Sequence, residues 1–140
     1  MIKTLIAILC VGTLSVSVSA AEWIDLGKSD DNNTQTFIDF DSVEPYTMRG
    51  KDYVSGFVQF TYINQHENRK DGWYYSKIFI VANCEKKSVG NVAAIVYGFK
   101  NEVIESGENK YFNESDMNIV FPETQGETIV DMMCYINNLS

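Results

Sequence analysis

The 140-residue sequence predicts an α+β domain, with an antiparallel sheet of about six strands packed against one C-terminal helix. Most of the chain beyond residue 21 alternates apolar and polar residues with the period of β-strands, whereas the last stretch changes to a helical period. Beyond the first 21 residues there are two cysteines, Cys84 and Cys134, and each falls on the expected buried face of its own element. A disulfide between them would tie the helix to the sheet.

The first 20 residues have the features of a cleaved signal peptide. Lys3 gives a positive start, residues 5–11 are apolar, and the run Val18-Ser19-Ala20-Ala21 supplies the small residues that signal peptidase requires. The apolar stretch is shorter than the roughly 20 residues that a membrane-spanning helix needs. We therefore expect a signal peptide at residues 1–20 and one mature domain at residues 22–140.

The leader predicts a soluble exported protein. A lipoprotein is not expected, because Leu9 precedes Cys10 where lipid attachment needs a small residue. All 19 acidic residues lie beyond the leader, together with every basic residue except Lys3, so the mature domain has a net charge of about −9. Nucleic acid is a poor partner for such a chain, since binding it requires clustered Lys and Arg.

Six segments have strand-like composition or alternation: residues 22–28, 36–43, 53–64, 73–84, 92–99 and 103–106. In the fourth of these, Ile78, Ile80, Ala82 and Cys84 share one face, so Cys84 points toward the expected core. We expect Pro45 to end the second strand. A turn over residues 86–91 should precede the fifth.

The C-terminal helix is expected to begin with a capping box formed by Thr124 and Glu127. Four apolar residues after it fall within one arc of a helical wheel: Ile129, Val130, Met133 and Cys134. A bond between Cys84 and Cys134 would close a loop of about 50 residues, worth roughly 4 kcal/mol in the chain-entropy model. The alternative is two reduced thiols that pack as small apolar groups.

No catalytic or metal-binding constellation is evident, so we expect neither an enzyme nor a cofactor. His66, the only histidine, lies in a charged loop without a second His or Cys at the spacing of metal ligands. The acidic pairs Asp30–Asp31 and Asp39–Asp41 do not fit a calcium-binding loop. No serine has the Gly-x-Ser-x-Gly setting of a hydrolase nucleophile.

A partly exposed aromatic patch is predicted instead. Strand alternation places Tyr74 with Ile78 and Ile80, and Trp73 and Tyr75 on the opposite face, where Phe57 of the preceding strand also points. Such a patch often marks a partner surface or a dimer interface. Alternatively, a loop or the helix covers it, in which case these residues form a second core. The turn with Lys86 and Lys87 is a further candidate contact surface.

The order of these landmarks resembles the surface-adhesin protein E family of bacterial exported proteins. The similar features are Glu22-Trp23-Ile24-Asp25-Leu26-Gly27 after the leader, Phe37-Ile38-Asp39 with Ser42-Val43, Asn83-Cys84-Glu85-Lys86-Lys87, and Pro122-x-Thr124-x-x-Glu127 followed by Cys134. The resemblance implies an antiparallel sheet of this size with a disulfide-tied helix. It also implies that members bind host extracellular-matrix proteins and can dimerise. Together with the leader, the resemblance implies a location in the periplasm or at the cell surface of a Gram-negative bacterium.

The sequence features and the family resemblance together predict two classes of function. The first is an exported, non-catalytic domain that binds a protein through Phe57, Trp73 and Tyr75 or through Lys86 and Lys87. The second is a structural or housekeeping periplasmic protein that dimerises through the aromatic patch and binds no host molecule. A small hydrolase is a distant third, because the sequence shows no convergent polar pocket.

We predict that N-terminal sequencing of the native protein will begin at Ala21 or Glu22, because Val18-Ser19-Ala20-Ala21 follows a short apolar region. An intact Met1, or a lipid on Cys10, would contradict the prediction of a cleaved leader.

Overall fold

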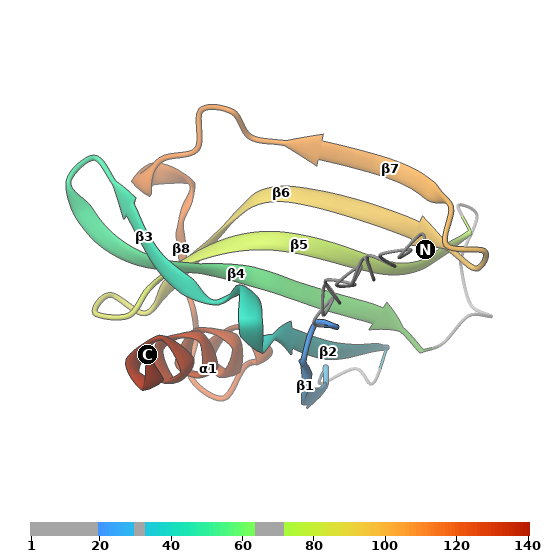
Figure 1. Ribbon diagram of the computed structural model, residues 1–140, viewed down its shortest axis with the longest axis horizontal. Helices are drawn as coiled ribbons and strands as arrows, with labels where there is room; N and C mark the ends of the chain where they lie inside the picture. The colour runs from blue at the N-terminus through green and yellow to red at the C-terminus, as the bar shows by residue number, and fades with distance from the viewer. Residues whose placement is uncertain (1–19, 30–32, 64–71) are drawn as a thin grey trace, which may run out of the picture.

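The computed structural model describes residues 20–29, 33–63 and 72–140, which form one eight-stranded antiparallel sheet and a single long helix (Figure 1). Six strands follow one another across the sheet: β1 (Trp23–Lys28), β2 (Thr34–Asp39), β4 (Lys51–Tyr62), β5 (Trp73–Asn83), β6 (Ser88–Gly98) and β7 (Val103–Glu108). Two short strands are added, β3 (Glu44–Met48) beside β4 and β8 (Asn118–Ile119) beside β6. The predicted sheet with a C-terminal helix is confirmed, although the domain is mainly β.

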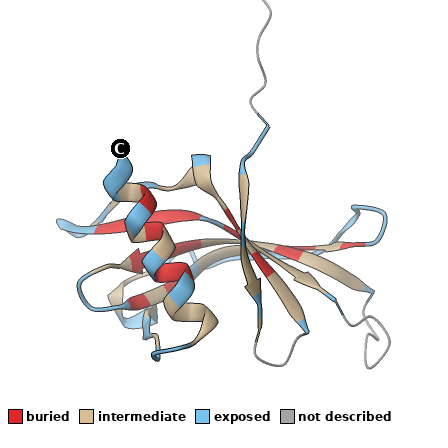
Figure 2. Cartoon of the chain, turned by 90° about the horizontal axis from the view of Figure 1, so that it is seen from below, coloured by how far each residue is buried: buried red, intermediate tan, exposed pale blue. Residues whose placement is uncertain are grey.

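The core lies between one face of the sheet and α1 (Gln125–Leu139), as the distribution of buried residues in Figure 2 shows. Its buried members are Ile38, Val54, Val58, Ile80, Ala82, Ile129, Val130, Met133 and Ile136. The alternation predicted for β4 and β5 is therefore confirmed, and so is the apolar arc of the helix. Full burial of one such side chain stabilises the fold by about 1.5–3 kcal/mol.

The helix begins as expected, but only half of the capping box forms. Thr124 is the N-cap, and its Oγ1 accepts a hydrogen bond from the backbone N–H of Glu127 at 3.4 Å. The Glu127 carboxylate accepts instead from the N–H of Glu123, at 2.7 Å. Both interactions satisfy donors near the helix start that would otherwise be unpaired.

Cys84 and Cys134 form the predicted disulfide, with their Cα atoms 5.9 Å apart. Cys84 follows the last residue of β5, and Cys134 lies in the second half of α1. Both pack against the core cluster. The bond therefore fixes the helix to the centre of the sheet rather than to an edge.

The second strand ends earlier than predicted. Asp39 Oδ1 accepts from the N–H of Asp41 at 3.2 Å, and Ser42 Oγ donates to the Asp39 carbonyl at 2.8 Å. These bonds turn residues 40–42 into a 3₁₀ helix instead of extended chain.

Pro45 does not end the second strand but lies inside β3, where it pairs with Val54. A proline is accepted there because β3 is joined to the sheet through β4 alone, so one of its edges needs no N–H donor.

The turn predicted over residues 86–91 is also wrong. Asn83 Oδ1 accepts from the N–H groups of Glu85 and Lys86, at 3.0 and 2.9 Å, which closes the turn directly after β5. Gly90 lies within β6 and has a packing role: a Cβ at that position would approach the Phe112 ring to 2.7 Å.

Among the described helices, none is both long and apolar enough to cross a membrane.

Replacing both Cys84 and Cys134 by Ser should lower the free energy of unfolding by up to about 4 kcal/mol, because the unfolded chain regains the freedom of a long loop. A urea titration measures this. The wild-type midpoint should fall when dithiothreitol is added, whereas that of the double variant should not change. Equal midpoints for the two proteins without reductant would mean that the disulfide does not stabilise the fold.

Candidate functional site

The sheet face opposite α1 carries a ladder of aromatic side chains. Phe57 on β4 lies opposite Phe79 on β5, with ring centres 5.1 Å apart, and Tyr75 on β5 stacks on Tyr97 of β6 at 4.7 Å. Phe57 is 42% exposed, although it is a large apolar side chain. We call these four residues the aromatic face. The predicted placement of Phe57 and Tyr75 on one face, away from Ile78 and Ile80, agrees with the structure.

A cation lies in the middle of this face. The Lys77 Nζ is 5.3 Å from the centre of the Trp23 ring and 6.0 Å from that of Tyr97, within the range of cation–π attraction. Partial burial, with smaller contributions from Tyr97 and Tyr74, raises the pKa of the Tyr75 hydroxyl above its ordinary value. That hydroxyl therefore stays protonated at neutral pH and donates to Asn101 Oδ1 at 3.2 Å.

Trp73 does not belong to the aromatic face, contrary to the prediction. The pairing of β5 with β6 shifts register between Trp73 and Tyr75, so one extra residue lies on β5 at this point. Trp73 consequently turns to the helix side, where its ring is 6.3 Å from that of Tyr62. Tyr74 takes the other side instead, with its ring stacked on Phe99 at 5.1 Å.

Two members of the aromatic face, Phe79 and Tyr97, were missed by the sequence analysis. Phe79 follows Tyr75 by two strand periods, so simple alternation along β5 could have indicated it. Tyr97 could not have been found in this way, because its stacking on Tyr75 depends on the register between two strands.

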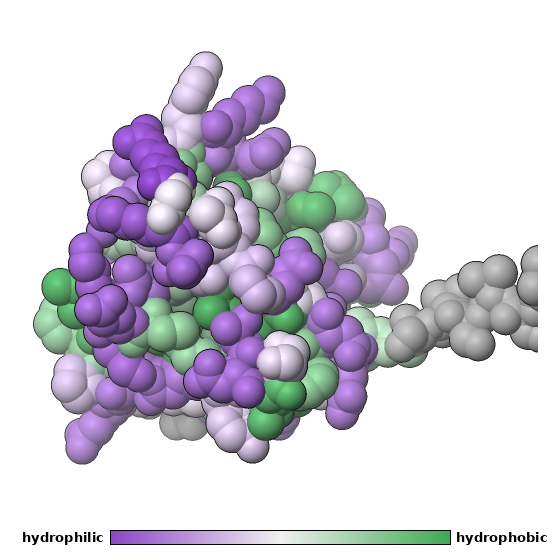
Figure 3. All heavy atoms as spheres, turned by 60° about the vertical axis from the view of Figure 1, so that its left-hand side comes forward, coloured by the Kyte–Doolittle hydropathy of each residue, from purple (hydrophilic) through white to green (hydrophobic). Residues whose placement is uncertain are grey.

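The basic turn lies at the far end of the sheet and is largely neutralised. Lys86 pairs with Glu114 at 2.6 Å, Lys51 pairs with the same carboxylate at 2.8 Å, and Lys87 pairs with Asp131. Hydrogen bonds from the two lysines lower the pKa of Glu114 to about 2, so its carboxylate stays ionised down to strongly acidic pH. Figure 3 shows this end of the molecule, where mostly hydrophilic side chains surround separate apolar areas.

The structure adds no candidate for catalysis or metal binding at the positions it describes. His66 and the pair Asp30–Asp31 lie outside the described residues, and Asp39 is the last residue of β2, where it caps the short 3₁₀ helix. Within the described ranges, no three His, Cys, Asp or Glu residues are grouped closely enough to hold a metal ion.

Comparisons of the chain with protein-family models, with curated proteins and with solved structures found no match. The geometry of the sheet faces is therefore the basis for the functional argument.

Trp73→Ala should destabilise the domain more than Phe57→Ala. Trp73 is half-buried on the helix side, so its truncation should cost about 2–3 kcal/mol, somewhat below the range for fully buried aromatics. Phe57 loses mainly its contact with Phe79, worth about 1 kcal/mol. Urea titration of both variants gives the comparison. A larger loss for Phe57→Ala would mean that the aromatic face is a second core rather than a surface.

Proposed function

We propose that this protein is an exported, non-catalytic domain that binds another protein through its aromatic face. One observation carries the proposal: aromatic rings from three neighbouring strands gather on the sheet face that α1 leaves uncovered, and Phe57 is 42% exposed among them. Aromatic side chains on a rigid sheet lose little conformational freedom on binding. They are also enriched among the residues that contribute most to protein interfaces.

The surroundings of the aromatic face fit a protein partner. The stacked and tilted ring pairs hold the side chains in place before binding, which reduces the entropy lost on association. Lys77 supplies a positive group near the rings, and the Tyr75 oxygen, whose proton is donated to Asn101, can still accept a hydrogen bond. An apolar centre with polar groups around it is the usual arrangement of an interface.

The resemblance to the surface-adhesin protein E family supports a host extracellular-matrix protein as the partner. The second candidate is a periplasmic protein that dimerises through the same face. It is favoured by the exposed ring of Phe57 on this face, since the same patch on two copies can pair around a twofold axis. Both functions use the aromatic face, so they differ in where the protein is found and in what it binds.

The binding test compares Phe57→Ala with Phe121→Ala in the mature domain. Phe121 is 73% exposed and precedes α1, so the control makes the same chemical change away from the aromatic face. Light scattering after size exclusion measures self-association, and immobilised matrix proteins measure host binding. Phe57→Ala should weaken one of these interactions at least tenfold, whereas Phe121→Ala should weaken neither. Equal behaviour of the two variants would overturn the proposal.

Protease treatment of intact cells then separates the two functions. An adhesin must be cleaved or labelled from outside the cell, whereas a periplasmic dimer must be protected until the outer membrane is opened. Self-association without surface exposure would support the second function.

A further inference from the structure

The helix covers only part of its own side of the sheet, and the strands continue beyond it (Figure 2). Two adjoining cavities lie on the uncovered part. The first, of about 440 Å³, is at the start of α1, with Phe60, Tyr62, Ile78, Ile80, Val89 and Ile129 as its apolar lining. The second, of about 290 Å³, extends over β6 and β7 from Asn91 to Trp73 and Glu105. Asn91 lines both, and we call the two together the groove.

Small residues keep the groove open. Ala94 pairs with Ile78 on one side and with Gly107 on the other, so the floor between the first and second cavities carries only a methyl group. A Cβ placed on Gly107 would meet no atom within 4 Å. At the other end, Gly126 lines the first cavity in the first turn of α1, where a larger side chain would narrow it.

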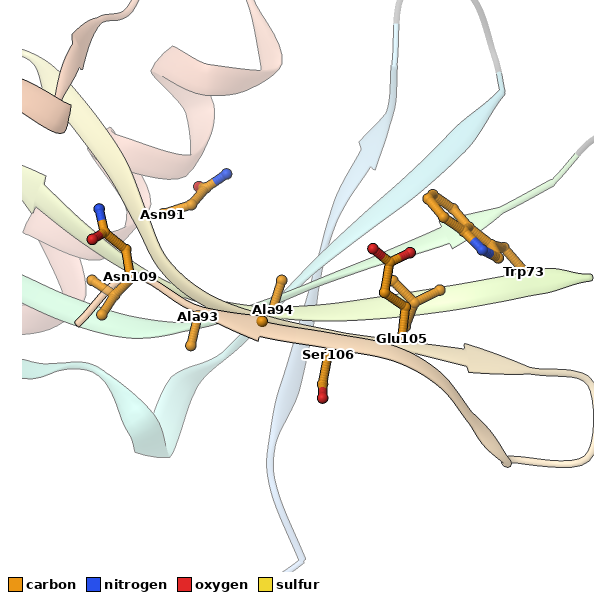
Figure 4. A pocket seen from close by; sticks show the side chains of 10 residues that line it. Trp73, Asn91, Ala93, Ala94, Glu105, Ser106 and Asn109 are labelled. Atoms are coloured by element: carbon orange, nitrogen blue, oxygen red, sulfur yellow. The ribbon is translucent and has the colours of Figure 1, made fainter. Parts of the chain in front are cut away.

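The described side chains that line the groove include a negative charge but no positive one. Glu105 is the single acidic residue among the described side chains that line either cavity, and no Lys, Arg or His is among them. Glu105 makes no ion pair or side-chain hydrogen bond within the described part of the chain. Figure 4 shows its carboxylate on the same side of the sheet as the Trp73 indole.

We propose that the groove binds an amphipathic organic cation, namely an aliphatic chain that ends in a quaternary or protonated amine. A carboxylate and an indole lining one cavity attract a cation through charge and through the ring quadrupole. The apolar lining that extends toward α1 accommodates the chain, and each buried methylene strengthens binding about fourfold. An anionic head would face Glu105, and no positive group is among the described residues that line the groove.

The first test is a titration of the mature domain with octyltrimethylammonium below its micelle concentration. The Trp23→Phe background leaves Trp73 as the sole tryptophan, so its fluorescence reports on the groove. Octanoate and octyl glucoside carry the same chain with a negative or neutral head. We expect saturable binding of the cation, at least about tenfold tighter than that of either control. Tetramethylammonium, which lacks the chain, should bind far more weakly.

The second test uses two variants with the same change of charge, Glu105→Gln and Glu108→Gln. Both residues are exposed on β7, but Glu105 pairs with Val96 and lines the groove, whereas Glu108 pairs with Ala93 on the opposite face. Affinity for octyltrimethylammonium should fall about fivefold or more in Glu105→Gln and change less than twofold in Glu108→Gln. Ala94→Leu, which fills the floor, should abolish the fluorescence change.

Three results would overturn the proposal. Equal losses in the two glutamate variants would mean that the cation responds only to the net negative charge of the domain. Equal affinity for octanoate would mean that the head group is not recognised. An absence of saturable binding with either background, wild type or Trp23→Phe, would mean that the groove does not take this class of ligand.

Discussion

The packing of α1 against one face of the sheet is the interaction on which the rest of the structure depends. A helix with its side chains is about 10 Å across, whereas strands of 11 and 12 residues, such as β5 and β4, extend for roughly 36–40 Å. One helix can therefore cover only a stripe of one face. The disulfide from Cys84 to Cys134 fixes where that stripe lies. The aromatic face and the groove are both parts of the sheet that the single helix leaves uncovered.

Period-2 alternation predicted the main core correctly because the sequence of a single strand is enough to show which of its side chains share a face. Ile80 and Ala82 on β5 were assigned to the core from this pattern, and the structure buries both. The same rule failed for Trp73, because a bulge depends on the register between two strands. A single extra residue reverses every assignment on one side of it. The groove was missed because its lining comes from several strands and from α1, which only the folded chain brings together.

Boundaries depend on side-chain hydrogen bonds that composition alone does not specify. Thr124 was recognised as a helix cap because its spacing from Glu127 follows a known local pattern. Asn83 and Asp39 end their strands by accepting backbone N–H bonds, but the same residues are also common inside ordinary loops. The Lys86–Glu114 pair joins residues 28 positions apart, so only the folded chain reveals that the basic turn is neutralised.

The two proposed sites lie on opposite sides of β5, and this arrangement bears on whether they can act independently. Tyr75 belongs to the aromatic face and Trp73 to the groove, only two residues away along the strand. Trp73 and Tyr75 on either side of the bulge are held by pairing with β6, and Tyr75 also pairs with β4. A ligand on one side can influence the other only if it binds two arrangements of this bulge with different affinity. Each side also has its own lining residues, so a change at Phe57 should affect binding at the aromatic face alone, and a change at Glu105 binding in the groove alone. If a change at one of these residues altered binding at the other site, the bulge would be identified as a mobile element.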